Sequence, residues 1–436
     1  MGYLPLDEGS TGSDHRLDRR HGGCRAREGD AGRRTGVFEK AGAGVSPSWN
    51  VFCSDDRIAF TDSFSVVGDL RLRIDRSDLR DLGGGVSWAP ATLHEQDGAT
   101  AAVCTRSALT AVVARLAADG LEARVGHEIE FTLFGDACNG AWSAYGLGAV
   151  LRREDFLKDL LRNAERAQLH IEQVHAEYGP DQFEISIAPA TPVQAADLVI
   201  LARILISRTA RAHGLAASFS PIPTVGGAGN GAHQHFSLNS GGRPVFSGGG
   251  QEYGMTDKGS SALGGILSHL AEFTAVFASS PLSGVRLRPD NWSGAYVCWG
   301  LENREAALRF CAESPSNPHG ANAEVKIVDP SANPYLATAA ILGLSHIGIG
   351  NASPLPPEIV VNPSTLTEAE RDERGVTRVP TDLREIVQKF NSSSVAKEIF
   401  GESIIEAMVS VKGVERETFS QMDEATTVER LRYTWS

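Results

Sequence analysis

Cysteine is scarce in this sequence, and its few copies are scattered. Only 6 cysteines occur among 436 residues, and no two of them form a Cys-x-x-Cys pair. This distribution disfavours a disulfide framework and a cysteine-based zinc module. It favours a reducing compartment, and we therefore expect a cytoplasmic protein.

The sequence also lacks long hydrophobic runs. No uninterrupted apolar stretch approaches the roughly 18 residues that a membrane-spanning helix needs. The apolar residues 198–206 are interrupted by Arg203 and predict a buried helix. The N-terminus carries no hydrophobic region of the kind found in signal peptides, so we expect no membrane association.

Basic residues are outnumbered by acidic ones. The chain has 41 Lys and Arg against 54 Asp and Glu, which gives a net charge of −13. This balance disfavours nonspecific nucleic-acid binding, because no basic surplus exists to neutralise phosphates. An anionic substrate would need local clusters of Arg and Lys.

The pattern along the chain divides it into three parts. Residues 1–35 are rich in Arg, Asp and Gly with little apolar periodicity, and predict an irregular or disordered arm. Residues 36–100 carry short strand-like segments and predict a small β-rich domain. Residues 101–436 alternate strands with helices and predict a large domain of the α+β class, with a sheet or half-barrel lined by ligands and backed by helices.

The helices of the large domain are predicted from apolar spacing and capping residues. Thr191 followed by Pro192 reads as a helix start, and Gly214 as its end. Apolar residues at helical spacing predict the other helices, which we place at residues 106–118, 153–168, 261–278 and 334–347. Strands are expected at residues 122–134, after Pro180, and at residues 323–328.

Polar side chains two residues apart mark these strands. Residues i and i+2 of a strand point to the same face, so the pattern pairs the following side chains: Glu128 with Glu130, Gln182 with Glu184, His233 with His235, and Glu324 with Lys326. Each pair alone is equally typical of a half-buried strand with one solvated face. Together they predict a carboxylate cluster with imidazole, which suits Mg²⁺ or Mn²⁺.

Arginines supply the expected basic partners. Arg286, Arg304 and Arg309 lie between the His pair and the last strand. Taken alone they are typical of surface ion pairs. Beside a two-metal carboxylate cleft they favour phosphoryl transfer from a nucleotide, because guanidinium binds phosphate in a bidentate manner.

Six motifs carry a resemblance to a known family. They are GHEIEFTLF from Gly126, EYGPDQFEI from Glu177, GNGAHQHFSL from Gly229, RLRP from Arg286, ENREAALRF from Glu302 and NAEVKIVDPSANPYLATAA from Asn322. In order and spacing the sequence resembles the bacterial type I branch of the glutamine synthetase family. The resemblance implies a β-grasp N-terminal domain and a catalytic α+β domain with a curved antiparallel sheet. It also implies a homo-oligomer, expected to be a ring-shaped dodecamer with active sites between subunits.

The resemblance implies a role for each candidate residue. One metal ion would be held by Glu130, Glu177 and Glu184, and the other by Glu128, His233 and Glu324. ATP phosphates and the transferred phosphoryl group would be contacted by His235, Arg304 and Arg309. Glutamate would be bound by Gly229, Arg286 and Lys326. The expected reaction joins the γ-carboxylate of glutamate to an amine through γ-glutamyl phosphate, with ATP as substrate and two or more Mg²⁺ or Mn²⁺ ions per site.

One position departs from the ammonia-using members of the family. Where those enzymes carry a glutamate that closes over the site, this chain has Trp292. An indole offers an apolar wall and a π face, which suit an organic amine or its ammonium head. The sequence is therefore most similar to the glutamate–amine ligase relatives. Two alternatives remain open, namely a glutamine synthetase that uses ammonia and a non-catalytic scaffold or sensor.

Overall fold

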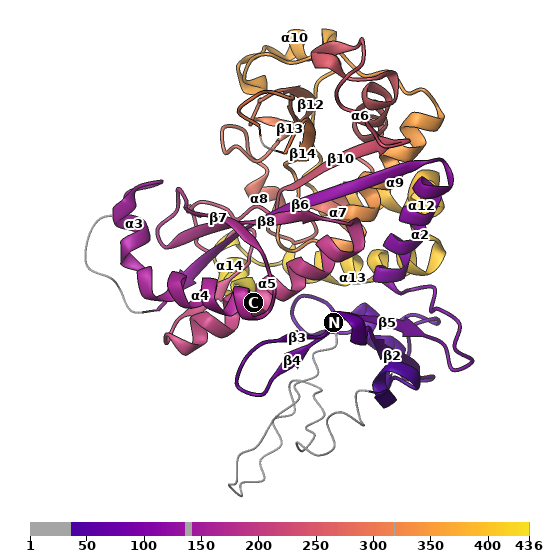
Figure 1. The fold of residues 1–436 in the computed structure, drawn as a ribbon, viewed down its shortest axis with the longest axis vertical. Helices are drawn as coiled ribbons and strands as arrows, with labels where there is room; N and C mark the ends of the chain where they lie inside the picture. Colours follow the sequence, from indigo (N-terminus) through magenta and orange to yellow (C-terminus); the bar gives the residue numbers. More distant parts are fainter. Residues whose placement is uncertain (1–35, 136–141, 318, 436) are drawn as a thin grey trace, which may run out of the picture.

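A large central sheet with helices packed around it dominates the structure (Figure 1). This computed structural model describes residues 36–135, 142–317 and 319–435. The arm predicted for residues 1–35 lies outside the described residues.

A small antiparallel sheet forms the N-terminal part. Its strands are β1 (Ala43–Val45), β2 (Leu70–Ile74) and β5 (Ala91–His94), with β2 in the middle. A separate pair consists of β3 (Arg80–Asp81) and β4 (Ser87–Trp88). The observed strands agree with the β-rich character predicted for this region, whereas the domain boundaries stay a prediction.

The core of this small sheet is completed by the far end of the chain. Val51 and Leu70 pack in one buried cluster with Ala407, which belongs to helix α13 (Glu402–Phe419). Both chain segments therefore contribute to the same apolar core although more than 300 positions separate them.

A buried polar contact fixes the same junction. The backbone amide of Ser54 donates to the Glu415 carboxylate at 2.8 Å, and Lys412 Nζ donates to its other oxygen at 2.7 Å. Glu415 is only 1% exposed. Because a buried carboxylate needs such partners, this pairing holds α13 against the small sheet.

The large sheet is mixed but mainly antiparallel. Its order is β15-β12-β13-β14-β10-β6-β8-β7, and β9 and β11 pair with its strands off this path. Only β12 and β13 run parallel. The strand bounds are β6 (Leu121–Phe134), β7 (Ile171–Ala176), β8 (Gln182–Ala190), β9 (Ala216–Ser218), β10 (Gln234–Ser240), β11 (Arg243–Pro244), β12 (Tyr296–Leu301), β13 (Ala306–Cys311), β14 (Asn322–Val325) and β15 (Thr377–Arg378). The predicted α+β class is confirmed.

Helices enclose the apolar side of this sheet. Their bounds are α2 (Thr105–Ala118), α3 (Leu147–Arg152), α4 (Glu154–Arg166), α5 (Pro192–Ala212), α6 (Asp257–His269), α7 (Thr274–Phe277), α8 (Ser283–Arg286), α9 (Pro334–Gly350), α10 (Glu368–Glu373), α11 (Leu383–Ser392), α12 (Ser394–Phe400) and α14 (Glu424–Leu431). The strand residues Ile129, Phe131 and Phe183 are fully buried, as their alternation with acidic residues predicts. Within the described ranges, no helix combines the length and apolarity needed to cross a bilayer.

One predicted helix is wrong in its extent. Residues 261–278 were expected to form a single helix, but the chain turns between α6 and α7. Phe273 lies in that turn, fully buried, with its ring 6.2 Å from Phe390 and 5.9 Å from Phe400. Packing of this aromatic cluster against the C-terminal helices offsets the loss of helical hydrogen bonds.

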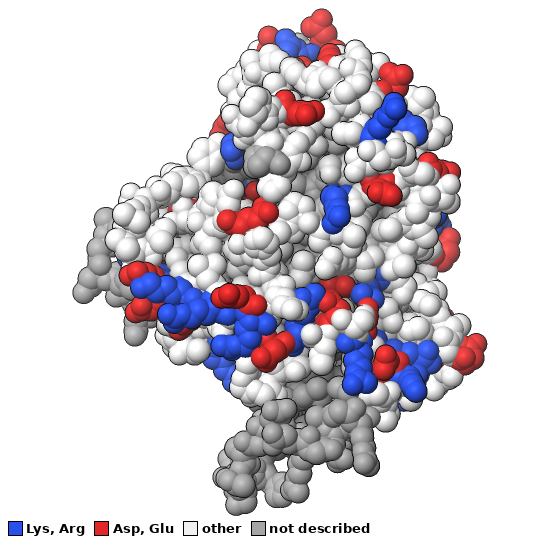
Figure 2. Space-filling view, viewed as in Figure 1, with Lys and Arg blue, Asp and Glu red and all other residues white. Residues whose placement is uncertain are grey.

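Charged side chains of both signs are intermixed on the surface. Figure 2 shows blue and red groups side by side in a band across the lower part of the face in view, while much of the upper part is white. Such neighbours form exposed ion pairs, for example Arg162 with Asp159 at 2.9 Å. Exposed pairs of this kind contribute little to stability, about 0–1 kcal/mol each.

Two glycines set the distance between α6 and α9. A Cβ at Gly265 would overlap the Leu344 carbonyl oxygen and Gly348 Cα, and one at Gly348 would overlap the Ser261 carbonyl oxygen. The two backbones therefore touch at a point where a side chain cannot fit.

We expect Gly265→Ala to destabilise the fold by about 1–3 kcal/mol, because the added methyl group forces the two helices apart. The measurement is the urea midpoint of unfolding. Gly350→Ala is the matched control, since Gly350 lies in the same helix pair and has nothing within 4 Å of an added Cβ. Equal midpoints for the two variants would contradict the role assigned to this contact.

Candidate active site

The register of four neighbouring strands brings the predicted side chains together. Glu130 of β6 lies opposite Glu184 of β8, and His235 of β10 lies opposite Glu324 of β14. Since β6 and β10 are adjacent, both cross-strand pairs share one face of the sheet. The polar face predicted from the sequence therefore exists as a single surface.

A first group consists of Glu130, Glu184 and His233, whose ligand atoms lie within 4.8 Å of one another. His233 Nε2 is 3.4 Å from Glu130 Oε1. The backbone amide of Gly231 donates to Glu130 Oε2 at 2.7 Å. Gly231 is needed here because a Cβ would come within 2.8 Å of the His233 ring.

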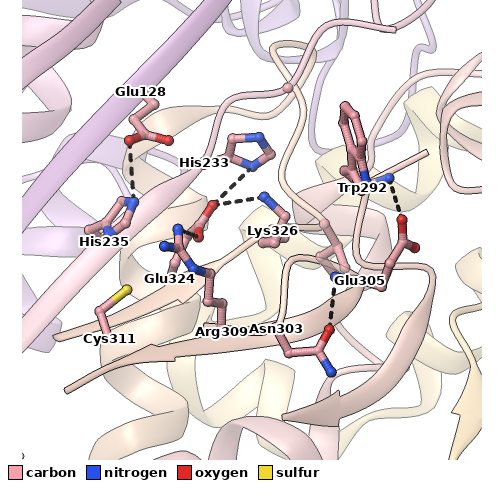
Figure 3. A network of polar contacts seen from close by, with 12 residues as sticks. Glu128, His233, His235, Trp292, Asn303, Glu305, Arg309, Cys311, Glu324 and Lys326 are labelled. Atoms are coloured by element: carbon pink, nitrogen blue, oxygen red, sulfur yellow. Dashed lines mark hydrogen bonds and ion pairs between the residues drawn. The ribbon is translucent and has the colours of Figure 1, made fainter. Parts of the chain in front are cut away.

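A second group consists of Glu128, His235 and Glu324 (Figure 3). His235 Nε2 is 3.5 Å from Glu128 Oε1, and His233 Nδ1 is 3.7 Å from Glu324 Oε1. His233 thus stands between the two groups, with one ring nitrogen toward each. The division of ligands between two ions that the resemblance implies stays a prediction.

A third group adds a histidine that sequence reasoning missed. His175 of β7 lies opposite Glu184, and these two side chains gather with Glu177. Glu177 lies beside Glu184, and its role as a metal ligand stays a prediction. His175 could have been found only by pairing β7 with β8, which the sequence pattern does not specify.

Burial and repulsion shift the acidity of these carboxyl groups. Burial, reinforced by the charge of Glu130, raises the pKa of Glu177 to about 7. The same causes, burial first and then the neighbouring carboxylates, raise the pKa of Glu184 well above its usual range. Burial also opposes ionisation of Glu324, but Lys326 and the nearby histidines outweigh it and lower the pKa of Glu324. Part of the cluster therefore holds protons until a cation replaces them.

The residues present fit divalent metal ions. Carboxylate oxygens with imidazole are the donors that Mg²⁺ and Mn²⁺ accept. Among the described residues, His233 Nδ1 and His235 Nε2 are buried with no hydrogen-bond partner. Buried polar atoms are normally paired, so the unpaired His233 Nδ1, 3.7 Å from Glu324 Oε1, supports a cation at this position.

The basic residues surround Glu324. Lys326 Nζ lies 3.0 Å from one of its oxygens and Arg309 lies 3.0 Å from the other (Figure 3). Arg309 also donates to Glu302, at 2.9 Å from Nε. Arg304 projects from the neighbouring turn and is exposed. Of the predicted phosphate-binding groups, His235 therefore belongs to the second group and Arg309 contacts it through Glu324.

The side chain of Arg286 is held by backbone carbonyl groups that follow β14. It is 5% exposed and donates to the carbonyl oxygens of Lys326 and Ile327, both at 3.2 Å. Its side chain also lies against Gly229, where a Cβ would come within 3.0 Å of Arg286 Cγ. The three positions predicted to bind glutamate, Gly229, Arg286 and Lys326, are thus brought together.

Gln182 is a further member of the site, although no ligand role was predicted for it. Its side-chain amide donates to the Gly229 carbonyl at 2.8 Å and to Glu130 Oε2 at 3.2 Å, and its oxygen accepts from Gly179. It fixes the glycine-rich loop to the metal face. Only its spacing from Glu184 pointed to this position.

Trp292 lies at the rim of the site. Its ring is 6.2 Å from that of Tyr178 in an edge-to-face arrangement, and the two side chains are 51% and 65% exposed. Tyr178 follows Glu177 directly, so this aromatic pair stands next to the metal face. The pair can receive an apolar or cationic group from solvent.

Comparison with known proteins agrees with this geometry. The family model described as glutamine synthetase, catalytic domain, matches residues 102–433. The chain is 38% identical over 395 residues to the gamma-glutamylpolyamine synthetase GlnA3 of Streptomyces coelicolor, covering 88% of this chain and 85% of that protein. It is 29% identical over 401 residues to the glutamine synthetase of Methanosarcina mazei, covering 85% and 88%. The crystal structure of a glutamine synthase homologue superposes with a TM-score of 0.83 at 26% identity, covering 92% and 93%.

We expect Mn²⁺ binding to release protons near neutral pH, because Glu177 has a pKa of about 7 and must ionise to bind a cation. Since the proton and the metal compete, the affinity for Mn²⁺ rises with pH through the neutral range. Titration calorimetry in buffers of different ionisation enthalpy measures the release. Glu177→Gln should release fewer protons, and an unchanged release in that variant would contradict the assignment.

Proposed function

The chain belongs to the glutamine synthetase family, and on this premise we propose that it is an ATP-dependent ligase joining the γ-carboxylate of glutamate to an organic amine. The observation that carries the proposal is the convergence of the acidic and imidazole groups on one sheet face beside Trp292 instead of a carboxylate. The acidic face supplies the ligase chemistry of the family, and the indole favours an organic amine over ammonia.

The metal ions of the proposed enzyme are Mg²⁺ or Mn²⁺. The predicted ligands are Glu130, Glu177 and Glu184 for one ion, and Glu128, His233 and Glu324 for the other. When bound, the ions neutralise charge on the phosphate oxygens during transfer. The unpartnered Nδ1 of His233 and the raised pKa of Glu184 support this assignment.

Phosphate recognition is assigned to His235, Arg304 and Arg309. Burial opposes protonation of His235, but its contact with Glu128 and the charge of Glu324 raise the pKa of His235 to about 9. A protonated imidazole donates to phosphate oxygens, which supports the role implied by the resemblance. The exposed Arg304 adds a bidentate donor for the transferred phosphoryl group, as the resemblance implies.

Glutamate binding is assigned to Gly229, Arg286 and Lys326. Arg286 has five N–H donors and uses some of them on backbone carbonyls, so others remain for a carboxylate. An oxygen of the γ-carboxylate attacks the terminal phosphorus of ATP, and ADP leaves. The amine nitrogen then attacks the γ-carbonyl carbon, phosphate leaves, and the nitrogen loses a proton.

The amine is assigned to the space beside Trp292 and Tyr178. An aromatic wall favours an alkyl or aryl amine, or its ammonium form by cation–π contact. The relative from Streptomyces coelicolor is named for polyamines, which fit this chemistry because they carry both methylene chains and cationic nitrogens. Glutamine synthesis from ammonia is the alternative, supported by the relative from Methanosarcina mazei. A non-catalytic scaffold or sensor remains a second alternative, which glutamate-dependent turnover of ATP would eliminate.

The proposed enzyme acts as a ring-shaped homo-oligomer, expected to be a dodecamer, in the cytoplasm. Four cysteines are free in the described part of the chain, namely Cys53, Cys104, Cys298 and Cys311. Unpaired thiols are usual in a reducing compartment, which supports the location. Mass photometry tests the ring, and a stable monomer would contradict it.

Phosphate release with ATP, glutamate, Mg²⁺ and a panel of amines tests the function. The panel contains ammonia, ethanolamine, an alkylamine, an aniline and a linear polyamine. We expect at least one organic amine to exceed ammonia in kcat/KM by about tenfold, since a cation–π contact contributes about 0.5–2 kcal/mol. If ammonia exceeds every organic amine, the chain is a glutamine synthetase. If glutamate elicits no turnover with any amine, it is not a ligase.

Trp292→Glu should lower kcat/KM for the best organic amine by about tenfold, because it replaces the π face with a carboxylate. The same change should increase the relative use of ammonia, whose small hydrated cation a carboxylate attracts. Trp292→Phe is the matched control, since it keeps an aromatic face and should lose less. Equal losses in the two variants would contradict selection by the aromatic wall.

A further inference from the structure

Glu305 is a buried carboxylate with no part in the reaction described above. It is 6% exposed and lies in the turn before β13. One of its oxygens, Oε1, accepts a hydrogen bond from the backbone amide of Trp292 at 2.8 Å (Figure 3). The other, Oε2, is buried without a hydrogen-bond partner among the described residues. A carboxylate in such a place is costly, so its retention requires a reason.

The loop that Glu305 holds has a strained backbone. Asp290 has φ 63° and Trp292 has φ 51°, both in the left-handed region that favours glycine. Such a conformation is unfavourable for a residue other than glycine and persists only when its surroundings fix it. Gly294 follows at φ 75° and lies against Lys326 and Ala307, where a Cβ would come within 3.0 Å of Lys326 Cβ. Close packing at Gly294 therefore holds the loop on the C-terminal side of Trp292.

The side chain of Trp292 contributes little to holding the loop. It is 51% exposed and contacts the exposed Tyr178 edge to face. Glu305 itself stands on a rigid base, because its backbone amide donates to Asn303 Oδ1 at 3.1 Å. The Asn303 side-chain amide in turn donates to the carbonyls of Ile359 and Val361, at 2.7 and 3.0 Å. The Glu305 carboxylate is thus the side chain that holds the backbone at Trp292 itself.

We propose that Glu305 is a positioning residue for the amine site, which fixes the strained loop so that the indole of Trp292 faces the incoming amine. This inference rests on the proposed function. Glu305 would then be a second residue, besides Trp292, that determines specificity for the amine. The carboxylate acts as a hydrogen-bond acceptor for the loop.

Direct contact between Glu305 and the amine is a different role, and burial argues against it. Both the residue as a whole and its unpaired Oε2 are shielded from solvent. Burial also raises the pKa of Glu305, while the amide of Trp292 opposes the shift. An acceptor role needs only an oxygen toward Trp292, which a glutamine also supplies, whereas ammonium binding needs the negative charge.

The experiment compares Glu305→Gln with Glu305→Ala in the full-length protein. In Glu305→Ala we expect KM for the best organic amine to rise by about tenfold while kcat changes less than about threefold and KM for ATP is unchanged. Glu305→Gln should stay within about threefold of the unmodified protein in KM, because its carbonyl accepts the same hydrogen bond. Glu313→Ala, an exposed acid beyond β13, is the control for loss of charge.

A double variant separates positioning from general damage. If Glu305 acts through the indole, adding Glu305→Ala to Trp292→Ala raises KM for the amine no further than Trp292→Ala alone. Additive increases would overturn the proposal, as would a Glu305→Gln variant as impaired as Glu305→Ala.

Hydrogen exchange provides a readout that needs no turnover. The amides of residues 290–294 should exchange about tenfold faster in Glu305→Ala than in the unmodified protein, and not in Glu305→Gln. Failure of the proposed function would show as absence of amide formation in the unmodified protein. Failure of the positioning role would show as unchanged exchange and an unchanged KM in Glu305→Ala.

Discussion

Mutual repulsion between carboxylates on one sheet face is the constraint on which the rest of this structure depends. Glu130 and Glu184 face each other across neighbouring strands, and Glu128 lies on the same surface. In a partly buried site these groups destabilise the fold unless they hold protons or bind cations. Lys326 and Arg309 pair with Glu324, and His235 faces Glu128. Burial and the neighbouring carboxylates raise the pKa of Glu177 and Glu184, so the charge at these two positions favours metal ions. The clustered carboxylates therefore lower the stability of the metal-free protein, and the same cluster forms a site that binds metal ions.

The face itself could be predicted from the sequence, because strand periodicity is a local property. The alternation of Glu128, Ile129, Glu130 and Phe131 specifies which side chains are polar and which are buried, and the structure has that pattern. The order of the strands is not local. His175 joined the cluster through the pairing of β7 with β8, and no spacing within either strand indicates that partner.

The features that could not be predicted from the sequence depend on loop conformation and tertiary packing. Residues 261–278 have continuous helical spacing, yet the burial of Phe273 against two distant phenylalanines interrupts the helix. Trp292 was identified by its place in a motif, but its left-handed backbone and its contact with Glu305 depend on two segments that meet only in the folded chain. The candidate residues could be identified from their chemical types and spacing in the sequence. The contacts that hold these residues in place could be seen only in the folded structure.

The junction between the small N-terminal sheet and helix α13 has a consequence for the order in which the protein forms. Val51 and Leu70 share their core with Ala407, and Ser54 is bonded to Glu415. During synthesis the small N-terminal sheet leaves the ribosome long before helix α13. Its apolar core therefore stays incomplete until the chain is almost finished. Such long-range contacts slow folding, and apolar surface that stays exposed until then favours aggregation.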